Sequence, residues 1–238
     1  MSSEVASRPV NRRAEIAFGI RLSLPAGLGM FPIGIAFGLL VIQYGLPWWM
    51  APALSIAVFA GSVELLLIGL IAAATPLATI ALTTVLVNFR HVFYAFSFPL
   101  HVVKNPLARA YSVYALIDEA YAITAVNPRG WNGWRLLATQ IAFQTYWVSG
   151  GLVGVLFASA LPGPVEGLEF ALCALFVTLT LDACRSRKEI PSLVMALACF
   201  GGALLLAPDS ALFVGMLLFV AALAVRFLLT RKGAPDHG

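Results

Sequence analysis

The sequence is a succession of long apolar stretches separated by short polar or turn-forming segments. The stretches that we expect to form helices cover residues 16–44, 50–74, 77–100, 110–126, 136–161, 170–183, 190–207 and 211–230. A helix that crosses a bilayer needs about 20 mostly apolar residues, whereas membrane strands give short alternating segments. The pattern therefore predicts an all-α fold, a polytopic transmembrane helical bundle of about 6–8 spans.

The charged residues between these stretches predict an orientation. Basic residues gather before residue 16, near Arg129, in the loop 184–189 and after residue 230. Because Lys and Arg are enriched in cytoplasmic loops, we expect tails at 1–15 and 231–238 in the cytoplasm, flanking a single transmembrane transporter domain at 16–230. Counting eight crossings leaves only Lys104 and Arg109 on the wrong side. Six crossings remain open if 110–126 and one neighbouring stretch do not cross.

Composition agrees with a membrane protein and argues against other classes. The chain of 238 residues is 61% hydrophobic and 11% charged, whereas a soluble domain carries about 25% charged residues. The net charge of +4 fits the basic cytoplasmic loops better than binding of nucleic acid. The apolar run after Arg12 and Arg13 is too long for a signal peptide. Cys173, Cys184 and Cys199 lack C-x-x-C spacing and are interpreted as packing residues.

Four polar side chains interrupt the apolar sequence between residues 59 and 99: Glu64, Asn88, Arg90 and His91. Ionisable groups at such depth usually face a bundle interior and by default mark a functional site. The break at Gly61-Ser62 directly precedes Glu64. A small-residue break beside an ionisable group is typical of discontinuous membrane helices, whose half-helix ends bind polar groups of a substrate.

Each candidate has a functional and a structural interpretation. Glu64 could bind a substrate ammonium or carry a proton, or it could only be bonded to the broken backbone. Arg90 suits a carboxylate, which a guanidinium binds through two bonds, but it could instead pair with Glu64, Asp118 or Glu119. His91 fits a proton shuttle and a hydrogen-bonded core histidine equally well.

The stretch 110–126 is short and carries Asp118-Glu119, so we expect a re-entrant or fully buried helix there, with these acids in a site or at a solvated edge. A polar loop is expected at 101–109. No His, Cys, Asp and Glu cluster has ligand spacing, so we predict no metal site, and no motif indicates a cofactor. A faint internal echo relates 32–49 to 150–164 and 58–71 to 168–181, as internal repeats do in many transporters.

Three blocks in order resemble the AzlC family of branched-chain amino-acid exporters. They are VFAGSVE at 58–64, VNFRHVFYAFSF at 87–98 and ALIDEAYAI at 115–123, and the run LPAGLGMFPIGIAFG at 24–38 is similar to that family's first helix. The resemblance covers about residues 21–227. Position 64 departs from the family pattern, in which glutamine is frequent.

The resemblance implies a secondary transporter of the bacterial inner membrane that exports valine, leucine, isoleucine and related small apolar compounds. It also implies a small AzlD-type membrane partner encoded separately. The residues on which it places functional weight are Gly61, Ser62, Glu64, Asn88, Arg90, His91, Asp118 and Glu119.

Two other classes of function compete with transport. A membrane enzyme of the transferase type would use His91 with Asp118 or Glu119. A structural scaffold would tolerate changes at Glu64 and Arg90. We favour transport over both, with the charged ends of a small zwitterion meeting Glu64 and Arg90, and therefore expect no enzymatic activity.

Overall fold

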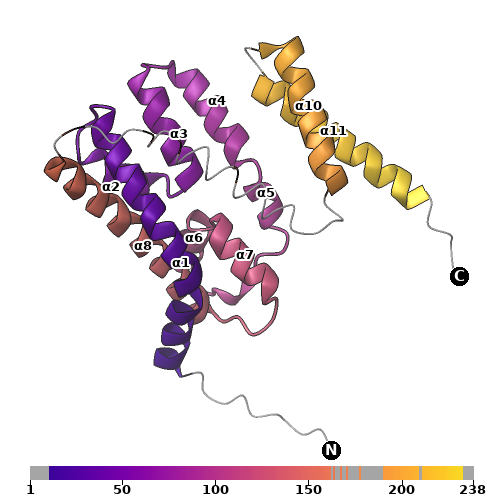
Figure 1. The fold of residues 1–238 in the computed structure, drawn as a ribbon. Helices are drawn as coiled ribbons and strands as arrows, with labels where there is room; N and C mark the ends of the chain where they lie inside the picture. Colours follow the sequence, from indigo (N-terminus) through magenta and orange to yellow (C-terminus); the bar gives the residue numbers. More distant parts are fainter. Residues whose placement is uncertain are drawn as a thin grey trace, which may run out of the picture. The chain divides into compact units, whose positions relative to one another are not determined.

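A computed structural model describes residues 11–161, 190–208 and 211–232, with isolated positions at 163, 167, 170 and 177. The chain forms two compact units, Met1–Leu172 and Cys173–Gly238. The secondary structure of the described residues is helical, which confirms the predicted all-α class (Figure 1). Most of the predicted span 170–183 and the basic loop 184–189 lie outside the described residues, as do Cys173 and Cys184.

Two long helices, α1 (Arg12–Gln43) and α8 (Gly133–Ala160), pack together at the centre of the first unit. They run parallel, because Gly19 of α1 lies against Arg135 and Thr139 at the start of α8, and Gly38 lies against Gly151 further along it. A Cβ atom on Gly38 would clash with the α8 backbone, so the glycines of both helices allow a close approach. Gly19 and Gly38 therefore serve the packing of α1 against α8.

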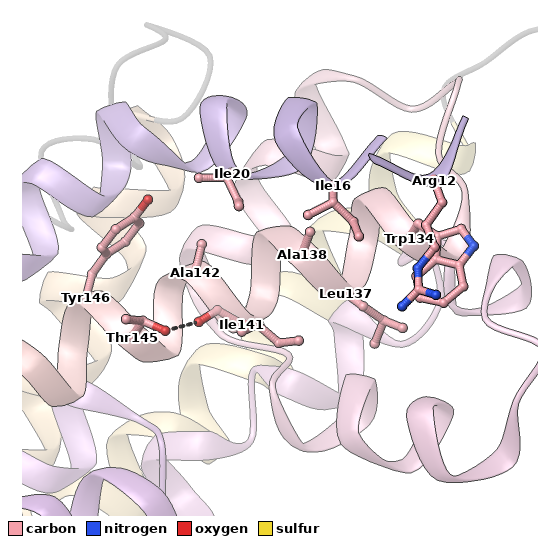
Figure 2. A pocket seen from close by; sticks show the side chains of 10 residues that line it. All are labelled: Arg12, Ile16, Ile20, Trp134, Leu137, Ala138, Ile141, Ala142, Thr145 and Tyr146. Carbon is pink, nitrogen blue, oxygen red and sulfur yellow. Dashed lines mark hydrogen bonds between the residues drawn. The ribbon is translucent and has the colours of Figure 1, made fainter. Parts of the chain in front are cut away.

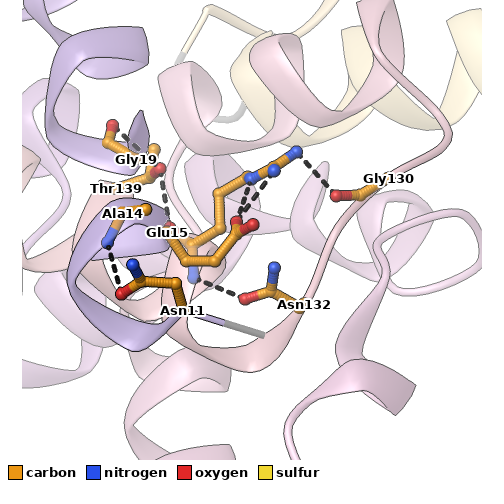
Figure 3. A network of polar contacts seen from close by, with 8 residues as sticks. Asn11, Ala14, Glu15, Gly19, Gly130, Asn132 and Thr139 are labelled. Atoms are coloured by element: carbon orange, nitrogen blue, oxygen red, sulfur yellow. Dashed lines mark hydrogen bonds and ion pairs between the residues drawn. The ribbon is translucent and has the colours of Figure 1, made fainter. Parts of the chain in front are cut away.

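The starts of these two helices are joined by a polar network (Figure 3). Arg135 Nε and Nη2 each lie 2.8 Å from Glu15 Oε2, and Nη1 donates to the carbonyl of Gly130 at 2.6 Å. Thr139 Oγ1 donates to the carbonyl of Gly19 at 3.2 Å. We call this end of the unit the basic end, and the opposite end, where α1 finishes before Trp48 and Trp49, the aromatic end.

The predicted second span, 50–74, is a hairpin that does not cross. Helix α2 (Met50–Ala57) enters from the aromatic end, and α3 (Gly61–Ala72) returns to it. The turn lies beside the middle of α8, where Gly61 meets the ring of Trp147. The later residues of α3 lie with Leu40 and Tyr44 at the end of α1. The break before Glu64 is confirmed, and the chain reverses there.

The chain then crosses to the basic end through α4 (Leu77–Asn88), α5 (His91–Tyr94) and the short 3-10 helix η1 (Leu100–Val102). The predicted span 77–100 is therefore present, with an interruption at Phe89 and Arg90. Its arrival at the basic end is fixed by Gly133, the first residue of α8, which lies against the backbone of Val102.

A second hairpin enters from the basic end. Helix α6 (Pro106–Tyr114) rises from Asn105, and α7 (Asp118–Val126) descends to the turn before α8. Ser112 and Ala115, near its tip, are bonded to Gln140 of α8. For the acidic stretch 110–126 the sequence predicted either a re-entrant or a fully buried helix, and the structure shows a re-entrant hairpin. The polar loop predicted at 101–109 is wrong after residue 105, because Asn105 caps a helix that Pro106 begins.

Three segments of the first unit thus pass from end to end, and two hairpins dip in from opposite ends. The helices of the described residues that are long and apolar enough to cross a membrane are Arg12–Gln43, Leu77–Tyr94 and Gly133–Ala160. They coincide with these three passages. Two apolar stretches of the first unit, 50–74 and 110–126, return to the side from which they enter. The first unit therefore agrees with the lower predicted number of spans, six.

The second unit contains α10 (Ile190–Leu206) and α11 (Ala211–Lys232), close to the predicted 190–207 and 211–230. They pack antiparallel, with Gly215 against the ring of Phe200 and Arg226 Nη1 donating to Ser192 Oγ at 2.7 Å. The helical boundaries shift the predicted tails slightly, since α1 begins at Arg12 and α11 continues to Lys232.

Candidate functional site

Arg90 lies where the two hairpins of the first unit meet. Its Nη2 donates to Ser62 Oγ of the first hairpin at 2.8 Å and lies 2.9 Å from Asp118 Oδ2 of the second. The side chains of Arg90 and Asp118 are 31% and 24% exposed, so this ion pair is only partly covered. One guanidinium therefore links two re-entrant segments that come from opposite ends.

Both half-helices that leave this point do so from their N-termini. Helix α3 begins after Ala60 and α7 after Ile117, and neither has a side-chain cap. The helices that begin at the basic end, in contrast, are capped by Asn11, Asn105 and Asn132. A helix N-terminus carries partial positive charge and free N–H groups. Glu64 in the first turn of α3 and Asp118 and Glu119 in the first turn of α7 supply the negative charge that complements these two ends.

Glu64 is not part of this exposed centre. It is fully buried and accepts three hydrogen bonds, from Ser55 Oγ (2.9 Å), Trp147 Nε1 (2.9 Å) and the backbone N–H of Ala60 (3.0 Å). The predicted alternative in which Arg90 pairs with Glu64 is wrong, because Arg90 pairs with Asp118. All three donors are neutral. Glu64 therefore holds α2, the hairpin turn and α8 together.

Asp118 and Glu119 open α7 beside Arg90. Asp118 accepts a second bond from Tyr94 Oη at 2.8 Å, and the ring of Tyr94 is stacked on Tyr121 with centroids 4.1 Å apart. Arg90 and Tyr94, one turn apart, thus hold the same carboxylate. The charges of Asp118 and Arg90 both act on the carboxyl group of Glu119. Its carboxylate has no ion pair within the described residues.

His91 and Asn88 lie at the same interruption. His91 Nδ1 is 2.9 Å from the backbone carbonyl of Asn88, and the imidazole packs edge-on against Tyr94. The structure records no bond from His91 to Asp118 or Glu119 in the part of the chain that it describes. The residues of the competing enzyme hypothesis are therefore near one another, with Tyr94 between His91 and Asp118.

Two buried side-chain atoms at this centre, Asn88 Oδ1 and Arg90 Nε, have no hydrogen-bond partner among the described residues. One is an acceptor and the other a donor. Buried polar atoms without partners are uncommon in folded proteins and call for an explanation, such as a catalytic or binding role. They belong to two of the residues that the sequence singles out.

The tips of the hairpins also touch each other. The rings of Phe59 and Tyr114 have centroids 5.8 Å apart, and Tyr114 Oη donates to the carbonyl of Ile56. Phe59 has a φ of +44° and is 2% exposed. A bulky residue in the left-handed region is strained, and such strain gathers at functional sites. Sequence reasoning missed this contact, because nothing local marks two distant aromatic residues as neighbours.

Helix α8 holds both tips with one face. Gln140 accepts from Ser112 Oγ at 2.7 Å and donates to the carbonyls of Ser112 and Ala115, while Gln144 bonds the hydroxyls of Tyr111 and Tyr114. Trp147, on the same face, bonds Glu64. The spacing of these three residues, i, i+4 and i+7 in an apolar helix, is the sequence signal that could have identified them.

The remaining polar groups do not suggest a metal site. No group of three or more His, Cys, Asp and Glu side chains comes together within the described residues. Cys199 of α10 is a half-buried free thiol.

Comparisons with known proteins agree on one family. The family model described as AzlC protein matches residues 25–161. Branched-chain amino acid transport protein AzlC of Bacillus subtilis (strain 168) is 28% identical over 232 residues, 91% of either chain. Inner membrane protein YgaZ of Escherichia coli (strain K12) is 25% identical, with 97% of either chain covered. An uncharacterized membrane protein of Haemophilus influenzae is 27% identical over 80% of this chain and 79% of its own. No solved structure matches the chain.

Proposed function

This chain belongs to the AzlC family of membrane proteins, and on that premise we propose that it is a secondary transporter that exports branched-chain amino acids. The Bacillus subtilis relative named as a branched-chain amino acid transport protein supports the substrate class. The absence of a nucleotide-binding motif in the sequence supports transport driven by the membrane potential or a proton gradient. A small AzlD-type membrane subunit is proposed as its partner, from the family resemblance.

We further propose the bacterial inner membrane as its location, with the basic end toward the cytoplasm. The Escherichia coli relative is named as an inner membrane protein, which supports this location. The basic side chains at that end are Arg12, Arg13, Lys104, Arg109, Arg129 and Arg135. Lys104 and Arg109 now agree with the positive-inside rule, because the hairpin of α2 and α3 removes one crossing before them. Both tails, 1–15 and 231–238, are then cytoplasmic and flank one transporter domain.

The single observation that carries the proposal is the link from Arg90 to both hairpins. A guanidinium binds carboxylates through two parallel bonds, and its Nε is one of the donors for such a pair. Arg90 Nε has no partner in the described part of the chain, while Nη2 contacts Asp118 and Ser62. The carboxylate of the substrate therefore competes with that of Asp118 for Arg90. Asp118 occupies the place beside Arg90 that the carboxylate of the substrate would take.

The other parts of an amino acid have candidate partners close by. Glu119 carries a carboxylate without an ion pair in the described part of the chain, and Asn88 Oδ1 is a free acceptor. Both suit an ammonium group. Glu64, which sequence reasoning assigned to this role, lies behind the hairpin turn with its acceptors occupied. The apolar side chain of the substrate would meet the aromatic tips, Phe59 and Tyr114.

Alternating access follows from the opposed hairpins. Because one hairpin enters from each end, moving either one away from Arg90 opens the centre to one side only. In this proposal, the Ser62–Arg90 bond holds the first hairpin in place and the Asp118–Arg90 pair holds the second, so each contact would keep one side closed. A substrate that breaks the ion pair opens the basic end first, as an exporter requires.

Efflux measurements test this function. Cells are loaded with dipeptides of labelled leucine, isoleucine or valine, with and without this chain and its candidate small partner. We expect the label to leave faster when both proteins are present. Equal efflux in all strains would reject the transport proposal. Arg90→Lys separates a transporter from a scaffold, which would tolerate that change.

A further inference from the structure

An apolar groove of about 430 Å³ runs between α1 and α8, away from the site around Arg90. Ile20 of α1 and Ile141 of α8 line it and are 43% and 52% exposed, so the groove opens on the surface of the first unit. Figure 2 shows Arg12 and Trp134 at one end of the groove and Tyr146 at the other. Thr145, drawn beside Tyr146, donates its hydroxyl to the carbonyl of Ile141 at 2.8 Å, and the side chains along the middle of the groove are apolar.

The groove is as long as one leaflet of a bilayer. Between Trp134 and Tyr146, α8 rises about 18 Å at 1.5 Å per residue. Half of the hydrocarbon core is about 15 Å. The groove begins at the basic end with a tryptophan, a residue that favours the membrane interface. It therefore runs from one interface to about the middle of the membrane.

The interfacial end of the groove carries a cation with free donors. The guanidinium of Arg12 lies over the ring of Trp134, 3.9 Å from its centroid. Stacking uses the flat face of a guanidinium and leaves the N–H groups at its edge able to bind an anion. The structure records no ion pair for Arg12 among the described residues.

We propose that this groove binds an anionic phospholipid of the leaflet at the basic end. One acyl chain lies along Ile20, Ile141 and Ala142, and the phosphate receives hydrogen bonds from Arg12. Basic pockets between helices are known sites for anionic head groups. The guanidinium at the interfacial end of the groove favours a lipid with an anionic head group over an apolar helix of a partner subunit.

Lipid binding by the purified full-length chain tests the proposal. Phosphatidylglycerol and phosphatidylcholine with identical chains are added in detergent, and bound lipid is counted by native mass spectrometry. We expect the unmodified protein to bind phosphatidylglycerol preferentially. Arg12→Gln should weaken that binding by about fivefold and remove the preference, since one cation near the surface contributes that much. The matched control is Arg13→Gln, the neighbouring exposed arginine that does not line the groove.

A second variant tests the groove itself. Ile141→Trp fills it from an exposed wall, so folding should be preserved, and it should reduce binding of both lipids. Leu156→Trp, an exposed position of α8 beyond the groove, should bind as the unmodified protein does. Equal binding of the two lipids, or full phosphatidylglycerol binding by Ile141→Trp, would overturn the proposal. So would displacement of the lipid by a co-expressed small membrane subunit that cross-links to position 141. None of these results depends on which solute is transported.

Discussion

Arg90 Nη2 lies 2.9 Å from Asp118 Oδ2, and this ion pair joins a helix that crosses the unit to a hairpin that does not. The same nitrogen holds Ser62 of the opposite hairpin. Three separate stretches of sequence therefore meet at one guanidinium. In the proposed transporter, each hairpin would release its own bond to Arg90, so the centre would have two separate ways to open.

Replacing Arg90 with lysine keeps the charge and removes the planar fork. Apparent affinity for the substrate should fall by about tenfold or more, because a hydrogen bond to a charged group contributes about 1.5–3 kcal/mol. Leucine transport is measured against substrate concentration in vesicles with matched amounts of protein. Arg109→Lys, near the basic end, is the control and should transport normally. Normal affinity in Arg90→Lys would make Arg90 structural.

Replacing Glu64 with glutamine should destabilise the first hairpin. The amide oxygen can still accept from Trp147 and Ser55, but the NH2 group then faces the N–H of Ala60, which costs about 1–3 kcal/mol in the free energy of unfolding. Thermal unfolding in detergent measures the loss. Trp147→Phe removes one donor, and the double variant should lose less than the two single losses combined.

The same variant separates the roles considered for Glu64. If Glu64 carried the proton of a coupled cycle, Glu64→Gln would keep its stability and its exchange but lose uphill efflux. If it bound the ammonium, only des-amino analogues would be transported as before. We expect neither pattern, and a lower melting temperature with both activities reduced together.

The re-entrant hairpins make a prediction about sidedness. In a chain whose three cysteines are replaced by serine, single cysteines are introduced at Trp48, Thr75, Lys104 and Asn127. A maleimide that does not cross membranes should label the first two from outside and the last two only from inside. An arrangement of eight crossings places Lys104 outside. Labelling of Lys104→Cys in intact cells would therefore reject the hairpin of α2 and α3.

The glycine contacts between α1 and α8 predict a contrast between two alanine substitutions. A Cβ on Gly154 would run into the backbone carbonyl of Ile35, whereas one on Gly29 meets nothing within 4 Å. Gly154→Ala should lower the free energy of unfolding by about 1–3 kcal/mol. Gly29→Ala should be neutral or stabilise by up to about 1 kcal/mol, from helix propensity. Equal melting temperatures for both variants would contradict the parallel packing described here.

Much of this organisation could be predicted from sequence, for identifiable reasons. Long apolar stretches specify helices, so the spans at α1, α8, α10 and α11 were placed within a few residues. The family was predicted from three short blocks and is confirmed. The break before Glu64 was predicted because Gly61-Ser62 punctuates an apolar run.

The sequence does not show whether the chain continues or reverses at the break before Glu64. A broken helix can continue or turn back, and both give the same 24 or so apolar residues. Only tertiary contacts, such as Leu40 with the later part of α3, show that it returns. The mismatch of Lys104 and Arg109 with the positive-inside rule was the sequence evidence against eight crossings.

The partners of the buried charges were also beyond local reasoning. From the sequence, Arg90 could pair with Glu64, Asp118 or Glu119. That it pairs with Asp118 depends on how deep each hairpin reaches. The start of α6, in contrast, could have been predicted, because Asn is favoured at a helix N-cap and Pro at the first helical position. The polar character of 101–109 favoured a loop instead.

The central claim is that Arg90 exchanges the carboxylate of Asp118 for that of a branched-chain amino acid. Counterflow in proteoliposomes containing the chain and its small partner tests it most directly. Vesicles are loaded with leucine, leucinamide or isoamylamine, and uptake of labelled leucine is followed. We predict that leucine drives uptake, that the two compounds without a carboxylate do not, and that Arg90→Lys loses the response. Equal uptake driven by leucinamide, or an unchanged response in Arg90→Lys, would contradict the claim.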